Sequence, residues 1–392
     1  MNKVYDSCCG IDVHKKLTVA CFIRGRRQEV REFGATTREL LALVDWLLEG
    51  GCQMVAMEST GSYWKPLYNI LESSGLEAMV VNAQHMKAVP GRKTDVRDSE
   101  WIADLLQHGL LTASFIPDRA QRELRELVGY RKSLVQDKNR ELNRLQKMLE
   151  GANIKLSGTV SDINGKSARC ILESLASGEA IDSAKYDELL AGKKISGRLK
   201  ASKEQILDDL NGVMSPLQRQ MMRIILSHID ELEAHIRELD GRIDDHMKPD
   251  EKKAVDAIKD VTGLGVDSAR IIISVIGTDM GRFPTDANIA SWAGLCPGSN
   301  ESAGKRRSGK TRKGNRLLRT TLITCAHSAA NSKKSFFHAQ FQRISAHRGS
   351  KRAYVAVAHS MLIAIYHILK DGVAFQDLGA DYYNQFNKGE EN

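Results

Sequence analysis

A regular apolar repeat in the second half of the chain limits its possible folds more than any other feature. Seven apolar residues follow one another at alternating steps of three and four, which is the heptad spacing that places them on one side of a long helix. Ser215 and Pro216 precede the repeat, and a serine followed by proline is a typical helix start. The residues of the repeat are Met222, Ile225, Ile229, Leu232, Ile236, Leu239 and Ile243.

Two different partners could cover this apolar face. The segment 121–150 also has the pattern of a long charged helix with leucines on one side, so the two helices could pair antiparallel within one chain. Alternatively, the same face of a second copy could cover it in a coiled-coil dimer. Both arrangements stay open. The segment 151–200 is rich in glycine and serine, and we expect it to form a small irregular helical insert.

The first hundred residues have a different pattern, typical of a sheet covered by helices. Three apolar runs separated by short polar turns indicate antiparallel strands, and helical segments then alternate with buried strands. This order predicts a mixed sheet with helices packed on it. The expected strands are 7–13, 17–23, 29–33, 54–58 and 78–81, and the expected helices are 37–49, with Thr37 as its N-cap, and 64–71.

Four carboxylates in this region could converge on one site. Asp12 lies inside the first strand and Glu58 ends a later one, while Asp95 and Asp98 are three residues apart, which places them on one face of a helix. A charge within an apolar strand is costly unless it is paired or bound to metal. Four carboxylates suit Mg²⁺ or Mn²⁺ better than zinc, and two such ions would hold a phosphodiester for in-line displacement. Alone, Asp12 or Glu58 is better explained as a capping or salt-bridged acid, and the pair Asp95 and Asp98 as an acidic first turn that complements the helix dipole. All four together, with a basic region downstream, favour a metal site.

Positive charge is concentrated near the other end of the chain. Between Ser302 and Lys370 there are 15 lysines and arginines and no acidic residue, which gives this segment a net charge of +15. Because the net charge of the whole chain is +8, the rest of the chain has a net charge of −7. Such a block indicates a polyanionic partner, and nucleic acid fits better than a membrane surface because no amphipathic helix presents aromatic residues opposite the cations. The residues expected to contact nucleic acid are Lys305, Arg306, Arg307, Lys310, Arg312, Lys313, Arg316 and Arg319.

A serine directly before this block is a candidate nucleophile. Ser302 lies in a turn rich in glycine, serine and asparagine, just before Lys305. Serine is a weak nucleophile until a base or a metal activates it, and neighbouring cations could stabilise the charge that develops on an attacked phosphate. Ser308 is the alternative for this role, and an ordinary loop hydroxyl is the simplest interpretation of either residue.

The remaining sequence suggests domain boundaries and a cellular location. The length predicts two or three domains, which we place at 1–118, 119–249 and 250–392. In the last domain, a glycine turn at 262–265 between two helices resembles a helix-hairpin-helix and could face a phosphate or be a plain turn. Helices are expected at 317–329 and 354–369, followed by a frayed end. Scattered cysteines, no membrane-length apolar run and no signal peptide favour a cytoplasmic protein.

Taken in order, these motifs resemble those of the DEDD-type insertion-sequence transposases, a family that includes the Piv-like site-specific invertases. The resemblance extends over most of the chain but matches no shared motif in the segment 151–200. The motifs that carry it are Gly10-Ile11-Asp12, Met57-Glu58-Ser59-Thr60-Gly61, Lys93-Thr94-Asp95 with Asp98, Gly294-Leu295-Cys296-Pro297 and Asn300-Glu301-Ser302-Ala303-Gly304-Lys305.

The resemblance implies a fold and a mechanism. The N-terminal domain would be RuvC-like, with the RNase H-like fold, and would carry the tetrad Asp12, Glu58, Asp95 and Asp98. A helical coiled-coil linker would lead to a mostly helical transposase domain, in which Ser302 would form a covalent link to DNA. The family also implies a guide (bridge) RNA that pairs with donor and target DNA, and an assembly of two to four copies with a shared site.

Two other functions remain as alternatives. A RuvC-like nuclease that resolves DNA junctions with metal-activated water would need the four acids but not Ser302. A non-catalytic RNA-binding protein would use the basic block alone, and its affinity would fall steeply with salt.

Overall fold

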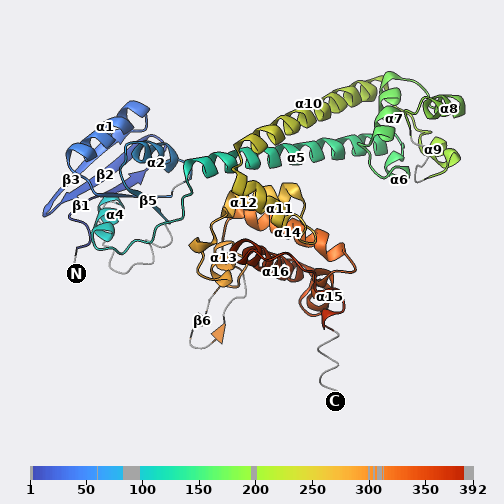
Figure 1. Ribbon diagram of the computed structural model, residues 1–392. Helices are drawn as coiled ribbons and strands as arrows, with labels where there is room; N and C mark the ends of the chain where they lie inside the picture. Colours follow the sequence, from blue (N-terminus) through green and yellow to red (C-terminus); the bar gives the residue numbers. More distant parts are fainter. Residues whose placement is uncertain are drawn as a thin grey trace, which may run out of the picture. The chain divides into compact units, whose positions relative to one another are not determined.

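The computed structural model describes residues 3–59, 61–82, 98–195, 201–298, 301–302, 305–306, 311 and 313–383. The chain divides into two compact units, Met1–Pro117 and Asp118–Asn392, which we call the N-terminal unit and the C-terminal unit (Figure 1). The predicted division of the second part into a linker and a C-terminal domain remains a proposal.

The N-terminal unit is built on a five-stranded mixed sheet with the order β3-β2-β1-β4-β5. The first three strands pair antiparallel, whereas β4 is parallel to β1 and β5 is parallel to β4. The predicted mixed α/β sheet is therefore confirmed, and its strand order is that of the RNase H-like fold. The strands are β1 (Ser7–Val13), β2 (Leu17–Arg24), β3 (Arg27–Gly34), β4 (Met54–Glu58) and β5 (Ala78–Val81).

Helices cover both faces of this sheet. Helices α1 (Thr37–Glu49) and α2 (Trp64–Ser73) bury one face, and α4 (Asp98–Gln107) buries the other. The predicted N-cap of α1 is wrong by one residue. Thr36 has the extended backbone of a cap and its side chain accepts from the Glu39 amide, whereas Thr37 is already helical.

In the C-terminal unit, the long helices α5 (Arg119–Gly151) and α10 (Pro216–His246) pack side by side within one chain (Figure 1). Ion pairs join Arg131 to Asp240 and Lys138 to Glu233, so the two helices run antiparallel. The apolar repeat therefore has a partner inside the chain, although a coiled-coil dimer remains untested. As predicted, Ser215 caps α10 and Pro216 is its first residue.

The insert between these helices is more regular than the sequence suggests. Its four helices enclose a separate apolar core with the adjoining ends of α5 and α10. The glycines do not interrupt the helices, because Gly165 and Gly178 lie at the two ends of α7. The insert comprises α6 (Leu156–Thr159), α7 (Lys166–Ser177), α8 (Ser183–Ala191) and α9 (Lys203–Asp209).

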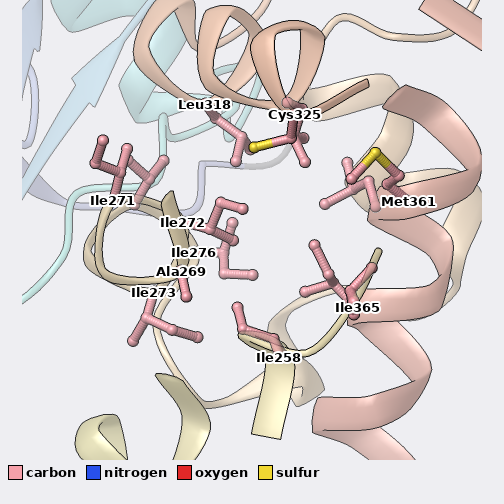
Figure 2. Packing of buried hydrophobic residues seen from close by; sticks show 14 of the residues in the cluster. Ile258, Ala269, Ile271, Ile272, Ile273, Ile276, Leu318, Cys325, Met361 and Ile365 are labelled. Carbon is pink, nitrogen blue, oxygen red and sulfur yellow. The ribbon is translucent and has the colours of Figure 1, made fainter. Parts of the chain in front are cut away.

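A second, larger core holds the last part of the chain together. Figure 2 shows Ile272 and Ile276 of α12 facing Met361 and Ile365 of α16, with Cys325 of α14 beside them. Its helices are α11 (Pro249–Ile258), α12 (Val266–Ile276), the short 3₁₀ turn η1 (Met280–Arg282), α13 (Asp286–Trp292), α14 (Arg316–Asn331), α15 (Phe336–Arg348) and α16 (Ser350–Asp371).

Helix α16 is long and apolar enough, by length and composition alone, to cross a membrane. Its apolar side chains are instead part of the core: Val357, Met361, Leu362 and Ile365 are fully buried among α12 and α14. This is the packing of a core helix, and it gives no support to a membrane protein.

The segment that follows α16 was predicted to be a frayed end, which is wrong for residues 372–383. Asp377 Oδ2 accepts a hydrogen bond from the Thr262 hydroxyl at 2.8 Å, and its Oδ1 accepts from the Phe336 amide at 2.7 Å. Phe375 also stacks on Phe337. These contacts are distant in sequence, so local composition could not reveal them.

Candidate functional site

Asp12 and Glu58 lie next to each other at the carboxyl ends of adjacent parallel strands. The register pairs Ile11 of β1 with Met57 of β4, so the next residue of each strand is an acid. Ile11 and Met57 are buried beneath α1 and α2. Because side chains alternate along a strand, Asp12 and Glu58 point to the opposite face of the sheet, which α4 covers.

The third acid, Asp98, reaches the same edge because of the direction in which α4 crosses the sheet. The Gln107 carbonyl, at the helix C-terminus, accepts a hydrogen bond from Val4, ahead of β1. At the other end of the helix, the Ser99 carbonyl lies directly over Gly10. The helix therefore runs antiparallel to β1, and its first residue, Asp98, lies toward the Asp12 end of that strand.

A glycine makes this close approach of helix and sheet possible. A Cβ atom on Gly10 would lie 2.2 Å from the Ala103 nitrogen and 2.5 Å from the Ser99 oxygen. Any side chain at position 10 would push α4 away from the sheet. Gly10 thus positions the start of α4 relative to Asp12, two residues further along the same face.

Asp12 and Glu58 lie at the ends of adjacent strands and Asp98 begins the helix that crosses them, whereas Asp95 lies outside the described residues. Within the described part of the chain, no three His, Cys, Asp or Glu side chains form a group close enough to hold a metal ion. The three acids nevertheless offer oxygen donors only, which fits Mg²⁺ or Mn²⁺. Asp98 is exposed, while the Asp12 side chain is only 14% exposed.

His14 is a neighbour of this site that the sequence reasoning missed. Its Nε2 atom lies 2.9 Å from Asp12 Oδ2, within hydrogen-bond distance. The spacing offered a weak signal, because His14 directly follows β1 and residues two apart in extended chain share a face. The imidazole occupies one oxygen of Asp12 from the solvent side, where it is 58% exposed.

The candidate nucleophile lies in a small hairpin of the C-terminal unit. Ser302 belongs to β6 (Glu301–Ser302), which pairs antiparallel with β7 (Lys305–Arg306), so that Ser302 faces Lys305 in the register. An isolated bridge between Pro297 and Thr311 closes the base of this loop. Ser308, the alternative nucleophile, lies outside the described residues.

The predicted nucleic-acid contacts divide into four groups. The backbones of Lys305 and Arg306 form β7, and the exposed Lys313 and Arg316 lie at the start of α14. Arg319 is half-buried and donates to the Gly294 carbonyl, so it holds the segment ahead of the hairpin in place. The residues outside the described part of the chain are Arg307, Lys310 and Arg312.

A cavity of about 920 Å³ adjoins the base of the serine hairpin. Pro297 and Thr311 form one side of it, and Lys351 and Arg352, exposed in the first turn of α16, line it with His359. Burial lowers the pKa of His359, which favours the neutral form of its ring. The two exposed cations add positive charge beside the hairpin, and only the fold places them there.

Comparisons with known proteins point in the same direction. Residues 9–154 match the family model of the DEDD transposases of IS110 type, and residues 255–342 match the model described as "Transposase IS116/IS110/IS902 family". The chain is 23% identical over 309 residues to the "Insertion element IS110 uncharacterized 43.6 kDa protein" of Streptomyces coelicolor, covering 73% of each chain. It is 24% identical over 326 residues to "Putative transposase y4qE" of Sinorhizobium fredii, covering 81% of this chain and 70% of the relative.

The two matches agree with the two sites described above. The first includes Asp12, Glu58 and Asp98, and the second includes the serine hairpin and α14. The DEDD domain is RNase H-like, as the strand order indicates, and such domains generally use divalent metal ions. Together the two models match more than half of the chain, in the order that the sequence motifs predict. The chain therefore belongs to the DEDD-type insertion-sequence transposases of the IS116/IS110/IS902 family.

Proposed function

We propose that this transposase cuts and exchanges DNA strands with two separate sets of residues. Asp12, Glu58, Asp95 and Asp98 hold Mg²⁺ or Mn²⁺, and Ser302 attacks the phosphodiester. The observation that supports the proposal most is the strand register, which places the acids Asp12 and Glu58 next to each other at the ends of β1 and β4, together with the direction of α4, which begins with Asp98 toward the same end of the strands.

The acids are suited to hold a cation near a phosphate. Asp12 and Glu58 extend from adjacent strand ends, whose backbones are fixed by the sheet, and Asp98 extends from a helix that packs directly on β1. Close carboxylates repel one another unless positive charge lies between them. A divalent ion bound there would offset that repulsion and withdraw charge from the phosphate oxygens.

In the proposed cleavage step, the Ser302 oxygen forms a bond to phosphorus and the bond from phosphorus to one DNA oxygen breaks. The serine proton passes to a base, and the leaving DNA oxygen takes up a proton to become a free hydroxyl. The reverse reaction with a hydroxyl from another strand releases the serine and completes the exchange. Cations around the hairpin, such as Lys313, Arg316 and Arg352, support this assignment because they favour a bound phosphate.

The partners follow from the basic block and the family. Transposases act on DNA, and we propose both a donor and a target DNA for this one. A guide RNA and an assembly of two to four copies extend the proposal. The charge of +15 between residues 302 and 370 is large enough to engage more than one nucleic-acid strand.

The test compares three variants of the full chain on DNA that carries the ends of its own element. We expect Asp12→Asn and Asp98→Asn to lose Mg²⁺-dependent strand cleavage, and Ser302→Ala to lose strand exchange while it keeps nucleic-acid binding. A covalent protein–DNA adduct, detected by its slower migration in a denaturing gel, should form with the wild type and not with Ser302→Ala.

The outcomes separate the alternatives. Cleavage that persists in Ser302→Ala without an adduct would favour a RuvC-like nuclease that uses water. Binding without any cleavage, unaffected by Asp12→Asn, would favour a non-catalytic RNA-binding protein. An adduct that still forms in Ser302→Ala would move the nucleophile to another residue, with Ser308 tested next.

A further inference from the structure

An open pocket of about 570 Å³ lies beside the acids of the N-terminal unit and is formed by two loops. One is the turn from β1 to β2, which supplies His14, Lys15 and Lys16, and the other precedes α2 and supplies Tyr63. These loops follow directly after the strand ends that carry Asp12 and Glu58. The pocket therefore opens at the same edge of the sheet as the proposed metal site.

The two lysines are placed so that they can bind an anion. The His14 amide donates to the Leu17 carbonyl at 2.8 Å, which closes a tight turn with Lys15 and Lys16 at its tip. Both lysines are exposed, and no ion pair links either of them to another residue in the described part of the chain. A phosphate that approaches the acids from this side would meet two adjacent ammonium groups.

Tyr63 gives the pocket an aromatic wall. Its side chain is 42% exposed, and Leu17 opposite it in the pocket is 37% exposed. The two aromatic residues that follow in the same helix behave differently, since Trp64 and Tyr68 pack edge to face with each other and against the core beneath the sheet. An exposed aromatic ring beside two lysines is the combination that binds unpaired nucleotides.

We propose that this pocket holds the unpaired DNA strand next to the phosphodiester that is cut. Lys15 and Lys16 contact its backbone phosphates, and Tyr63 stacks on one of its bases. The proposal rests on the proposed function, because it assumes that DNA is cut at Asp12 and its partners. All three are positioning residues: they hold the strand in register with the acids and take no part in bond making.

The first experiment measures binding of the full chain to a fluorescein-labelled single-stranded DNA of about 16 nucleotides, the upper end of the site sizes known for OB-fold domains that bind single strands. EDTA is included so that no strand is cut. The lysine variant is Lys15→Gln with Lys16→Gln. The matched control is Arg26→Gln with Arg27→Gln, which removes the same charge from two adjacent exposed residues, in the β2–β3 turn and at the start of β3, at the end of the strands opposite Asp12.

We expect the lysine variant to bind several-fold more weakly than the control. The slope of log affinity against log salt should fall by about 1.4, because each phosphate contact with single-stranded DNA contributes about 0.7. The control variant should keep the wild-type slope. Replacing both lysines with arginine should give the wild-type slope, because the two positive charges are kept. The basic block of the C-terminal unit is unchanged in all variants, so its contribution cancels in the comparison.

The second experiment tests the aromatic wall. Tyr63→Leu should weaken binding by about tenfold, because stacking of one base is lost, whereas Tyr63→Trp should keep it. Tyr130→Leu is the control, since Tyr130 is 59% exposed on α5 and belongs to the C-terminal unit, whereas the pocket belongs to the N-terminal unit. Equal melting temperatures for all variants would show that the fold is intact.

The results distinguish this inference from the proposed function. If the lysine variant keeps wild-type affinity and slope while Asp12→Asn loses cleavage, the pocket proposal is overturned and the proposed function stands. If Asp12→Asn still cuts DNA, the proposed function fails, and the binding data still decide the pocket. If the slope changes only with an RNA of the same sequence, the assignment to a DNA strand is wrong.

Discussion

At the scale of single residues, Gly10 has the clearest structural role. It is the position at which α4 touches the sheet, with the Ala103 nitrogen and the Ser99 oxygen inside the volume that a Cβ would occupy. The same contact sets where Asp98 begins the helix. One glycine thus connects the packing of the N-terminal unit with the geometry of the acids.

We predict that Gly10→Ala destabilises the N-terminal unit by about 1–3 kcal/mol, the usual cost of overpacking a well-filled core. Cleavage should fall as well, because α4 must move away from Asp12. Urea denaturation monitored by tryptophan fluorescence would measure the first effect. The control is Gly129→Ala in α5, where a Cβ meets no atom within 4 Å. This variant should be more stable than the wild type by about 0.5–1 kcal/mol, because alanine favours a helix over glycine. A Gly10→Ala variant with wild-type stability would mean that α4 is free to shift.

At the scale of elements, α5 is held at its start by polar contacts as well as by apolar packing. Asp118 caps it by accepting from the Gln121 amide at 2.7 Å. One turn later, Arg125 donates to the Ser274 carbonyl at 2.9 Å and to that of Val275, so it satisfies the C-terminal carbonyls of α12. Burial lowers the pKa of Arg125 to about 10.

The Asp118 cap makes the stability of the fold depend on pH. The pKa of Asp118 is lowered, first by the hydrogen bond from the Gln121 amide and then by Lys248. A carboxyl group with a lowered folded-state pKa stabilises the fold fully above its ordinary pKa, and this contribution is lost as the pH falls through the lowered value.

We therefore predict that Asp118→Asn, which keeps a cap acceptor but no charge, has a lower melting temperature than the wild type at neutral pH. The difference should vanish in strong acid. Asp118→Ala should cost about 1 kcal/mol more at neutral pH because the cap itself is lost. Melting curves recorded over a pH series would show this. A constant difference between wild type and Asp118→Asn at every pH would contradict the assignment.

At the scale of the whole molecule, the cores of the two units are separate. The clusters around the sheet contain residues up to Ile116, and the clusters of the C-terminal unit begin at Leu124, so no core cluster of described residues crosses the boundary at Pro117. The acids belong to one unit and the serine hairpin to the other. Each unit has a core of its own, but neither has both halves of the proposed chemistry.

We predict that fragments 1–117 and 118–392 each fold when expressed alone. Circular dichroism should show a mixed α/β spectrum for the first and a strongly helical one for the second, each with a cooperative melting transition. The second fragment should retain nucleic-acid binding with a steep salt dependence, since it contains the whole basic block. Neither should exchange strands. An unfolded first fragment would show that its fold depends on the C-terminal unit.

Local patterns in the sequence determined much of this protein. Short apolar runs and the polar turns between them located all five strands of the sheet, and the heptad spacing located α10 together with its cap at Ser215. These features depend on neighbours a few residues apart, which the sequence shows directly. For the same reason α15 was not anticipated, because Phe337 is its only buried residue and leaves no periodic signal.

The tertiary structure alone decided what lies beside what. It paired the apolar face of α10 with α5 in the same chain, fastened Asp377 to Thr262 and Phe336, and set Glu58 next to Asp12. It also formed the pocket between the turn at Lys15 and the loop at Tyr63. Such contacts join residues tens to more than a hundred positions apart. Their formation depends on strand order and on close approaches such as that at Gly10. The periodicity of a single segment carries no information about either.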